Sequence, residues 1–187
     1  ARALIDDQIF EWHKRAQGYK IRHVPATLPD MLKTNQMLEW EYSEHLGRTS
    51  ADAINAARDR LDWMRAANSD FEIVIAQHKL ESMCRAEGYY RTLPSAVRIE
   101  QIKRMIDLIE NLYPRMRVYV YDARMLYSSP MTVFGPQLAV LYLGQNYMAF
   151  RDSQRIDGFA NHFDRIVREA RITSREFSPF LSKFLQP

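Results

Sequence analysis

Three short apolar runs in the C-terminal half lie so close together that only one kind of sheet connection can join them. The runs are MTVF, LAVLYL and YMAF, separated by GPQ at 135–137 and by GQN at 144–146. Parallel strands need a crossover of about a dozen residues or more, whereas antiparallel strands can be joined by a short turn containing glycine. The spacing therefore predicts an antiparallel meander over residues 131–150.

Two stretches upstream of the meander predict two more strands, FEIVIA at 71–76 and RVYVYDA at 117–123. FEIVIA is rich in β-branched residues and apolar on nearly both faces, which is typical of a strand inside a sheet. Between the two strands, apolar periodicity predicts helices over about 78–87, ended by Gly88, and over about 94–112.

The N-terminal third is predicted to be mostly helical. Apolar periodicity indicates helices over 3–17 and 35–45, and a third helix that opens at TSAD, 49–52, and continues to about residue 67. Thr34 is expected to cap the second helix. The run YKIRHV, 19–24, predicts a short extended segment between the first two helices.

Two more helices are expected after the meander. Asp152 or Ser153 is expected to cap the first of them. The start of the last helix has two alternatives, because TSRE offers a capping box at Thr173, whereas Pro179 fits best in the first turn of a helix beginning after Ser178.

This order of elements predicts an α+β fold, a mixed sheet of about five strands with an antiparallel meander, covered by helices, plus a helical N-terminal third. Residues 1–68 are predicted to form a helical N-terminal extension packed on the core. Residues 69–187 are predicted to form the α+β domain, and the two parts together one compact unit.

Composition places the chain among ordinary ordered proteins. It has 187 residues, a formal charge of +3 and interleaved basic and acidic side chains, so a nucleic-acid interface within it is not required. The only cysteine, Cys84, cannot form an intrachain disulfide, and no signal peptide or apolar run of membrane-spanning length is visible. We therefore expect a cytoplasmic protein without membrane contact. Because the chain opens at Ala1 in a helical pattern and without Met, we expect another segment before it.

The sequence shows no reactive motif. No two of the five histidines have the i, i+3 or i+4 spacing of a helical metal pair, and the six glycines form no phosphate-binding loop. Cys84 lies among apolar neighbours, which raise a thiol pKa and so oppose a nucleophilic role. We expect no metal, no cofactor and no catalytic residue. A small hydrolase or transferase using Asp122 or Asp152, each of which follows a strand, is kept as an alternative.

The polar side chains around the predicted sheet allow two interpretations. Strand tyrosines that alternate with aliphatic residues usually pack on covering helices. The same residues also suit a ligand pocket, which is mostly apolar with a few polar anchors. If a ligand is bound, we expect it between the meander and the helices, in contact with Asp122, Arg124, Tyr142, Tyr147 and Arg151.

Four stretches of the chain carry a resemblance to a known family. They are IRHVPATLPDMLKTNQML, AARDRLDWMR, IEQIKRMIDLIENLYPRMRVYVYDA and the long segment from MTVF to SRE. Over about residues 21–182 they resemble the C-terminal domain of unknown function that follows the helix-turn-helix in many Xre-family bacterial transcriptional regulators. The chain departs from that family at Ala26 and Thr27, where the family prefers glycine. A fainter similarity is to phospholipase D-like effector domains, whose His-x-Lys signature is absent here.

The resemblance implies an effector and dimerisation domain of a cytoplasmic transcriptional regulator, without catalysis. It implies a DNA-binding domain before Ala1 as the only part that contacts DNA, and a module that forms a homodimer, receives a signal, or does both. If a signal is sensed, the first hypothesis is a small molecule. The alternative is a protein-interaction module controlled by a small antagonist protein.

Overall fold

A computed structural model describes the backbone of residues 2–43, 50–144 and 146–186, with side chains from residue 8 onward in those ranges. Within these ranges one mixed sheet contains six strands in the order β3-β2-β1-β4-β5-β6. The strands are β1 (Ile21–Val24), β2 (Phe71–Ala76), β3 (Met116–Tyr121), β4 (Met131–Phe134), β5 (Leu138–Leu143) and β6 (Asn146–Phe150).

The sheet is parallel on one side and antiparallel on the other. Strands β1, β2 and β3 are parallel, β4 is antiparallel to β1, and β4, β5 and β6 form the predicted meander. The α+β class is confirmed, but the expected number of strands, about five, is too low by one. The extra strand is the extended run at 19–24, which becomes β1 and lies in the middle of the sheet, so the N-terminal third supplies a central strand.

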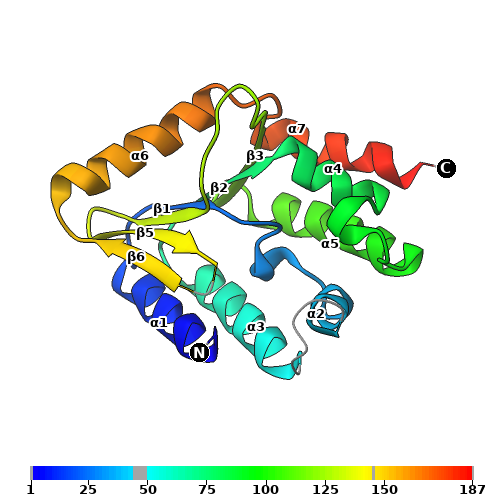
Figure 1. The fold of residues 1–187 in the computed structure, drawn as a ribbon, viewed down its shortest axis with the longest axis horizontal. Helices are drawn as coiled ribbons and strands as arrows, with labels where there is room; N and C mark the ends of the chain where they lie inside the picture. Colours follow the sequence, from blue (N-terminus) through cyan, green and yellow to red (C-terminus); the bar gives the residue numbers. More distant parts are fainter. Residues whose placement is uncertain (1, 44–49, 145, 187) are drawn as a thin grey trace.

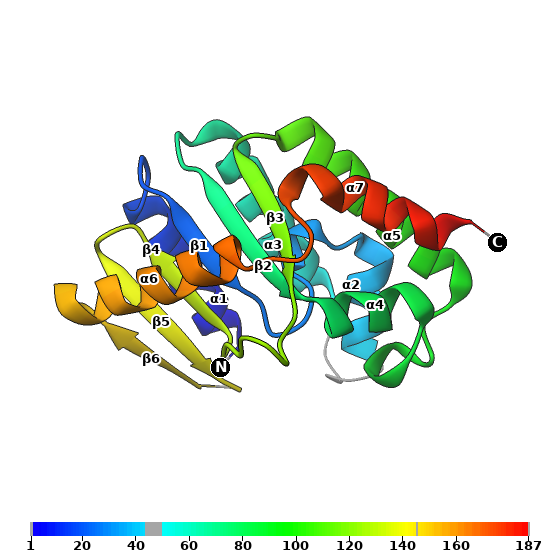
Figure 2. The same ribbon diagram turned by 90° about the horizontal axis from the view of Figure 1, so that it is seen from above.

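Helices cover the two faces unequally (Figure 1). One face carries α1, α3, α5 and α7, whose side chains share the main core with the sheet, while α6 packs on the opposite face. Figure 2 shows α6 crossing above the strands. The helices are α1 (Arg2–Arg15), α2 (Asn35–Glu41), α3 (Ala51–Ala66), α4 (Gln77–Arg85), α5 (Ser95–Leu112), α6 (Ser153–Arg168) and α7 (Ser174–Ser182), with 3-10 turns η1 (Asp30–Leu32), η3 (Gly88–Tyr90) and η4 (Lys183–Leu185).

The predicted caps explain where α2, α6 and α7 begin. The Thr34 hydroxyl accepts a hydrogen bond from the Met37 amide, and the Asp152 carboxylate accepts one from the Arg155 amide. Thr173 forms a complete capping box with Glu176, so α7 begins there and keeps a proline inside the helix; the alternative start after Ser178 is wrong.

Two other predicted boundaries have different outcomes. Helix α4 ends at Arg85 and is followed by Ala86 in the left-handed conformation (φ 56°), so it stops before the expected Gly88. The end of the helix predicted over 35–45 and the first residue of TSAD at 49 lie outside the described residues. No helix in the described ranges is both long and apolar enough to cross a membrane.

The two edges of the sheet differ. Along β3, Val120 exchanges backbone hydrogen bonds with Ile172, and the Val118 amide donates to the Ser174 hydroxyl at 3.2 Å. We call the segment 171–174 the edge cover. Along β6, within the described residues, the backbone pairs with β5 and with no other segment.

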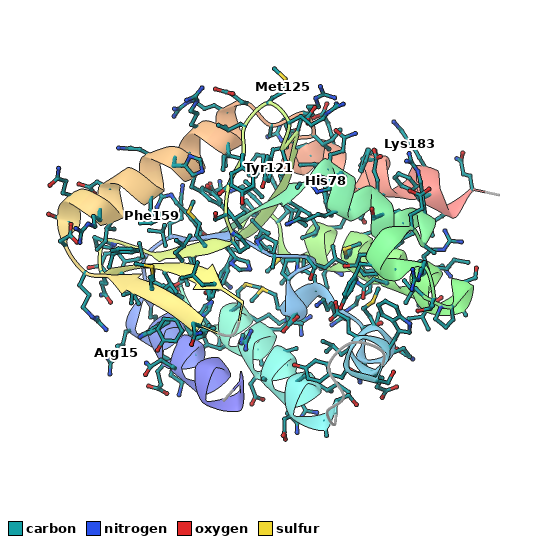
Figure 3. The ribbon with its side chains drawn as sticks, in the orientation of Figure 1. Arg15, His78, Tyr121, Met125, Phe159 and Lys183 are labelled. Atoms are coloured by element: carbon teal, nitrogen blue, oxygen red, sulfur yellow. The ribbon has the colours of Figure 1, made fainter. Side chains whose placement is uncertain are left out.

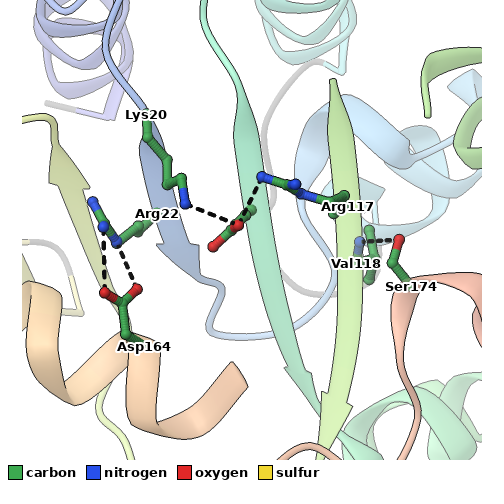
Figure 4. A network of polar contacts seen from close by, with 7 residues as sticks. Lys20, Arg22, Arg117, Val118, Asp164 and Ser174 are labelled. Atoms are coloured by element: carbon green, nitrogen blue, oxygen red, sulfur yellow. Dashed lines mark hydrogen bonds and ion pairs between the residues drawn. The ribbon is translucent and has the colours of Figure 1, made fainter. Parts of the chain in front are cut away.

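Charged side chains fix α6 to its face of the sheet (Figure 4). The Arg22 guanidinium donates from Nε to the Asp164 carboxylate at 3.0 Å, which joins β1 to α6. Beside it, the buried Glu72 carboxylate accepts hydrogen bonds from Lys20 and Arg117 at 3.1 and 2.8 Å. Each of these charged groups on this face of the sheet is thus paired with an opposite charge. The pairing reduces the cost of burying these groups beneath α6.

Candidate functional site

A cleft opens at the carboxyl ends of the parallel strands β2 and β3. The two strands end level with each other, Ala76 opposite Tyr121, and α4 begins directly after β2 while the chain after β3 turns away at Asp122. In open sheets this is the place where ligands bind, because the strand ends and the following loops leave a crevice. The cleft has a volume of about 560 Å³ and is lined by Gln77, His78, Glu81, Asp122, Ala123 and Arg124.

Asp122 forms one wall of the cleft and is held from three directions. The Arg124 guanidinium binds both carboxylate oxygens, from Nε at 3.1 Å and from Nη2 at 2.9 Å. The Arg124 amide donates to Oδ1 at 3.0 Å, which makes a tight turn directly after β3. From the other side, Arg171 places Nη2 2.9 Å from Oδ2. The carboxylate is therefore fixed in position by two cations.

These contacts set what Asp122 can do chemically. Hydrogen bonds from the Arg124 side chain and amide, together with the charges of Arg124 and Arg171, lower the pKa of Asp122 to about 2. Near neutral pH the group is ionised, so it accepts hydrogen bonds and cannot serve as a general acid. Two arginines already compensate its charge, which suits a fixed recognition group better than a proton-transferring one.

The opposite wall of the cleft comes from the first turns of α4. The Gln77 amide nitrogen donates to Glu81 at 2.8 Å, and Arg85 contacts the other Glu81 oxygen at 3.2 Å. His78, one residue into the helix, is exposed. Figure 3 shows His78 on α4 and Tyr121 at the end of β3. The cleft thus offers donors and acceptors from both walls.

The loop after β3 places apolar side chains beside the cleft. Met125 and Tyr127 are 77% and 73% exposed, and Met125 points outward at the end of the loop (Figure 3). Beneath Met125 a small hollow of about 40 Å³ reaches α6, lined by Tyr121, Asp122, Met125, Leu126, Ile166, Glu169 and Arg171. Asp122 lines both the cleft and the hollow, so it forms a wall that the two share.

The structure brings together two of the five residues predicted to bind a ligand. Asp122 and Arg124 both line the cleft. Tyr142 and Tyr147 lie on β5 and β6, where the Tyr142 hydroxyl is 2.9 Å from the Thr132 hydroxyl and the Tyr147 ring packs edge-on against Trp12. Because β5 and β6 are four and five strands away from β3, Tyr142 and Tyr147 lie about 19 and 24 Å across the sheet from β3 at ordinary strand spacing.

Arg151 and Asp152 follow β6, which runs antiparallel to β5 and therefore opposite to β3. Both are exposed, and Asp152 caps α6. The carboxylates of Asp122 and Asp152 consequently lie at opposite ends of the sheet. The two carboxylates therefore do not share a site, because the strands that they follow point in opposite directions.

Sequence reasoning missed the α4 side of the cleft. Gln77, His78 and Glu81 were not among the predicted ligand residues, although a helix was expected close to this position. The available signal was the absence of a loop between FEIVIA and that helix, together with a strand-helix-helix-strand order long enough for a parallel crossover. Parallel neighbours would have placed the start of the helix beside Asp122.

The described ranges do not favour metal binding or thiol chemistry. They contain no group of three histidine, cysteine or acidic side chains placed to hold a metal ion. Cys84 is buried in α4, and burial raises the pKa of its thiol to about 12, which disfavours the thiolate. The cleft at the ends of β2 and β3 is lined mainly by residues with polar or charged groups.

Comparison of the chain with protein-family models, with curated proteins and with solved structures found no match.

Proposed function

We propose that this chain is the effector and dimerisation domain of a cytoplasmic bacterial helix-turn-helix regulator of the Xre type, and that it receives a small polar ligand in the cleft between α4 and the loop after β3. The observation that carries the proposal is Asp122, a carboxylate held rigidly by two arginines in the wall of a cleft of about 560 Å³. DNA is contacted by a domain outside this chain.

The cleft suits recognition without turnover. Recognition needs groups held in fixed positions before the ligand arrives, since ordering them afterwards costs affinity. The hydrogen bonds within Asp122-Arg124 and Gln77-Glu81 hold both walls in this way. Arg124 keeps 82% of its side chain exposed, so its remaining donors are accessible to an incoming ligand.

Ligand binding to the cleft is tested by thermal denaturation of the chain against a library of polar metabolites. A ligand at a hundredfold excess over its Kd stabilises the folded chain by about 2.7 kcal/mol. A compound that acts through the cleft should lose this effect in Arg124→Ala and His78→Ala. Arg151→Ala is the matched control, because it removes another exposed arginine, one that does not line the cleft.

Two results would contradict the proposal. One is a library in which no compound raises the melting temperature of the wild-type chain. The other is a ligand whose binding survives Arg124→Ala but not Arg151→Ala, which would move the site to the far end of the sheet. The regulator class is tested separately by reading the coding sequence upstream of Ala1, which should encode a helix-turn-helix.

A small antagonist protein is the second candidate signal. Met125 and Tyr127 favour it, since two large apolar side chains exposed next to each other on one loop are typical of a protein-binding surface. Replacing both by Ser should abolish capture of such a protein while leaving metabolite binding in the cleft intact. Unchanged capture would remove this candidate.

A further inference from the structure

The outer edge of β6 has none of the features that normally keep an edge strand from pairing. Proteins protect such edges with charged side chains, prolines, bulges or a covering segment. The five residues of β6, NYMAF, contain neither a charge nor a proline, and each pairs in register with a residue of β5. In the described part of the chain no other segment lies along its outer side.

Apolar side chains are exposed at the same edge. Met148 is 47% exposed and Leu143 is 50% exposed. The register places Met148 opposite Leu141 and Leu143 opposite Asn146, so all four side chains point to the face that α6 covers. Leu141 packs into the α6 core, whereas Met148 and Leu143 extend beyond it.

We infer that β6 is the dimer interface of this protein: two copies pair β6 with β6 antiparallel about a two-fold axis centred on Met148, which joins their sheets into one. The partner is a second copy because an antiparallel strand is complementary to itself, each copy offering the same backbone donors and acceptors. In this register Met148 lies opposite its own counterpart, and Asn146 lies opposite Phe150.

The charges around β6 suit a copy of the same chain. No ionisable side chain lies within the strand, so self-pairing brings no like charges together. The first flanking charge, Arg151, would stand at opposite ends of the paired segment in the two copies, about 20 Å apart by strand rise and beyond the Debye length of about 8 Å at physiological salt. A partner strand of either sign would gain no ion pair along β6.

This inference rests on the dimeric part of the proposed function and is independent of the ligand cleft. The cleft lies after β3, at the other side of the sheet from β6. A monomeric chain that still binds a ligand would therefore overturn the interface alone. A dimeric chain that binds no ligand would overturn the cleft alone.

The first test measures the association of the 187-residue chain by sedimentation velocity from micromolar to submillimolar concentration. We expect a dimer. Met148→Lys should raise the dissociation constant of the dimer by about tenfold or more, because like charges then face each other across the two-fold axis. Met125→Lys is the matched control: it places the same charge on a more exposed methionine away from β6 and should leave the dimer unchanged.

A mixing experiment separates lost pairing from lost folding. Met148→Lys and Met148→Glu should each be weak dimers alone and should form a heterodimer when mixed, since opposite charges then meet. In a Cys84→Ala background, Met148→Cys should form a disulfide-linked dimer on mild oxidation, because directly opposite residues in antiparallel strands have Cα atoms about 4.5–5.5 Å apart.

Three outcomes would overturn the interface. They are a wild-type chain that stays monomeric at every concentration, a Met148→Lys variant that associates as well as Met125→Lys, and a mixture of the Lys and Glu variants that forms no heterodimer. Pairing of β6 with a strand from another protein would give the first of these results.

Discussion

At one side of the sheet β3 exchanges backbone hydrogen bonds with the edge cover, residues 171–174, while at the other side β6 pairs only with β5 in the described structure. The edge cover along β3 leads directly into helix α7. This helix packs against both β3 and α5. Nothing comparable follows β6, whose successor α6 turns across the face of the sheet. In the described structure, the cover of the β3 edge is continuous with a helix that has a buried residue, Phe177.

The largest expected effect comes from truncating this buried residue. Phe177 of α7 is completely buried, so Phe177→Ala should lower the free energy of unfolding by about 3–5 kcal/mol through lost burial and the cavity it leaves. Urea denaturation measures this loss. Phe180→Ala, at a half-buried position on the same helix, is the control and should cost clearly less. Equal losses would mean that α7 is not anchored through Phe177.

Acid should weaken the antiparallel side of the sheet. Burial, together with the charge of Arg60, lowers the pKa of His13 to about 3 and the pKa of His23 to about 4. His23 lies 2.8 Å from the Thr132 hydroxyl, which in turn contacts Tyr142, so this network extends from β1 to β5.

The sign of the pH effect follows from proton binding. Below pH 6.5, the ordinary histidine pKa, the unfolded chain takes up protons that the folded chain does not bind, so stability is complete above pH 6.5 and falls as the pH drops toward about 4 and 3. Between about pH 7 and about pH 5 the loss should be roughly 2 kcal/mol for each histidine. His23→Gln should remove the contribution of His23 to the pH dependence of the unfolding free energy, which urea denaturation measures. An unchanged pH dependence would contradict the role given to His23.

A smaller effect is expected from the polar contact of the edge cover. Ser174→Ala removes the hydroxyl that accepts from the buried Val118 amide, which should cost about 1–3 kcal/mol. Hydrogen exchange should become faster at the Val118 amide alone. A general loss of helix α7 would instead speed exchange at many amides. Ser182→Ala is the control, because its exposed hydroxyl only donates within its own helix.

The smallest effect concerns the attachment of α6. Asp164→Asn breaks the partly buried pair with Arg22 and should cost about 1 kcal/mol. Glu169→Gln breaks a more exposed pair with Arg165 on the same helix, where about 0.3–0.5 kcal/mol is expected. Equal costs would show that burial at the sheet adds nothing to the Arg22-Asp164 pair.

Local signals in the sequence were sufficient for most elements. The meander followed from spacing, and the caps at Thr34 and Asp152 followed from side chains that bond to nearby amides. Strand β1 was harder to recognise as part of the sheet, because it has four residues and two of them, Arg22 and His23, are polar. What makes it a strand is its pairing with Phe71 and Phe134, which are distant in sequence.

The candidate site was predicted only in part, because local sequence places some of its residues and strand order places the others. Asp122 and Arg124 are close in sequence, so one turn suffices to place them together. Tyr142, Tyr147 and Arg151 were grouped with them by residue type, but strand order and direction decide which of these side chains can meet. That order depends on where β1 inserts, and no local pattern specifies it.

Asp122 connects the cleft with the edge cover. Arg124 holds it on the cleft side, and Arg171 holds it on the side of the edge cover, where the Arg171 amide also donates to the Val120 carbonyl. A ligand with a cationic group would compete with Arg171 for this carboxylate. Because coupling between two sites is reciprocal, a ligand that displaces Arg171 from Asp122 also weakens the attachment of the edge cover to β3. Ligand binding in the cleft would then change the β3 edge without moving a helix.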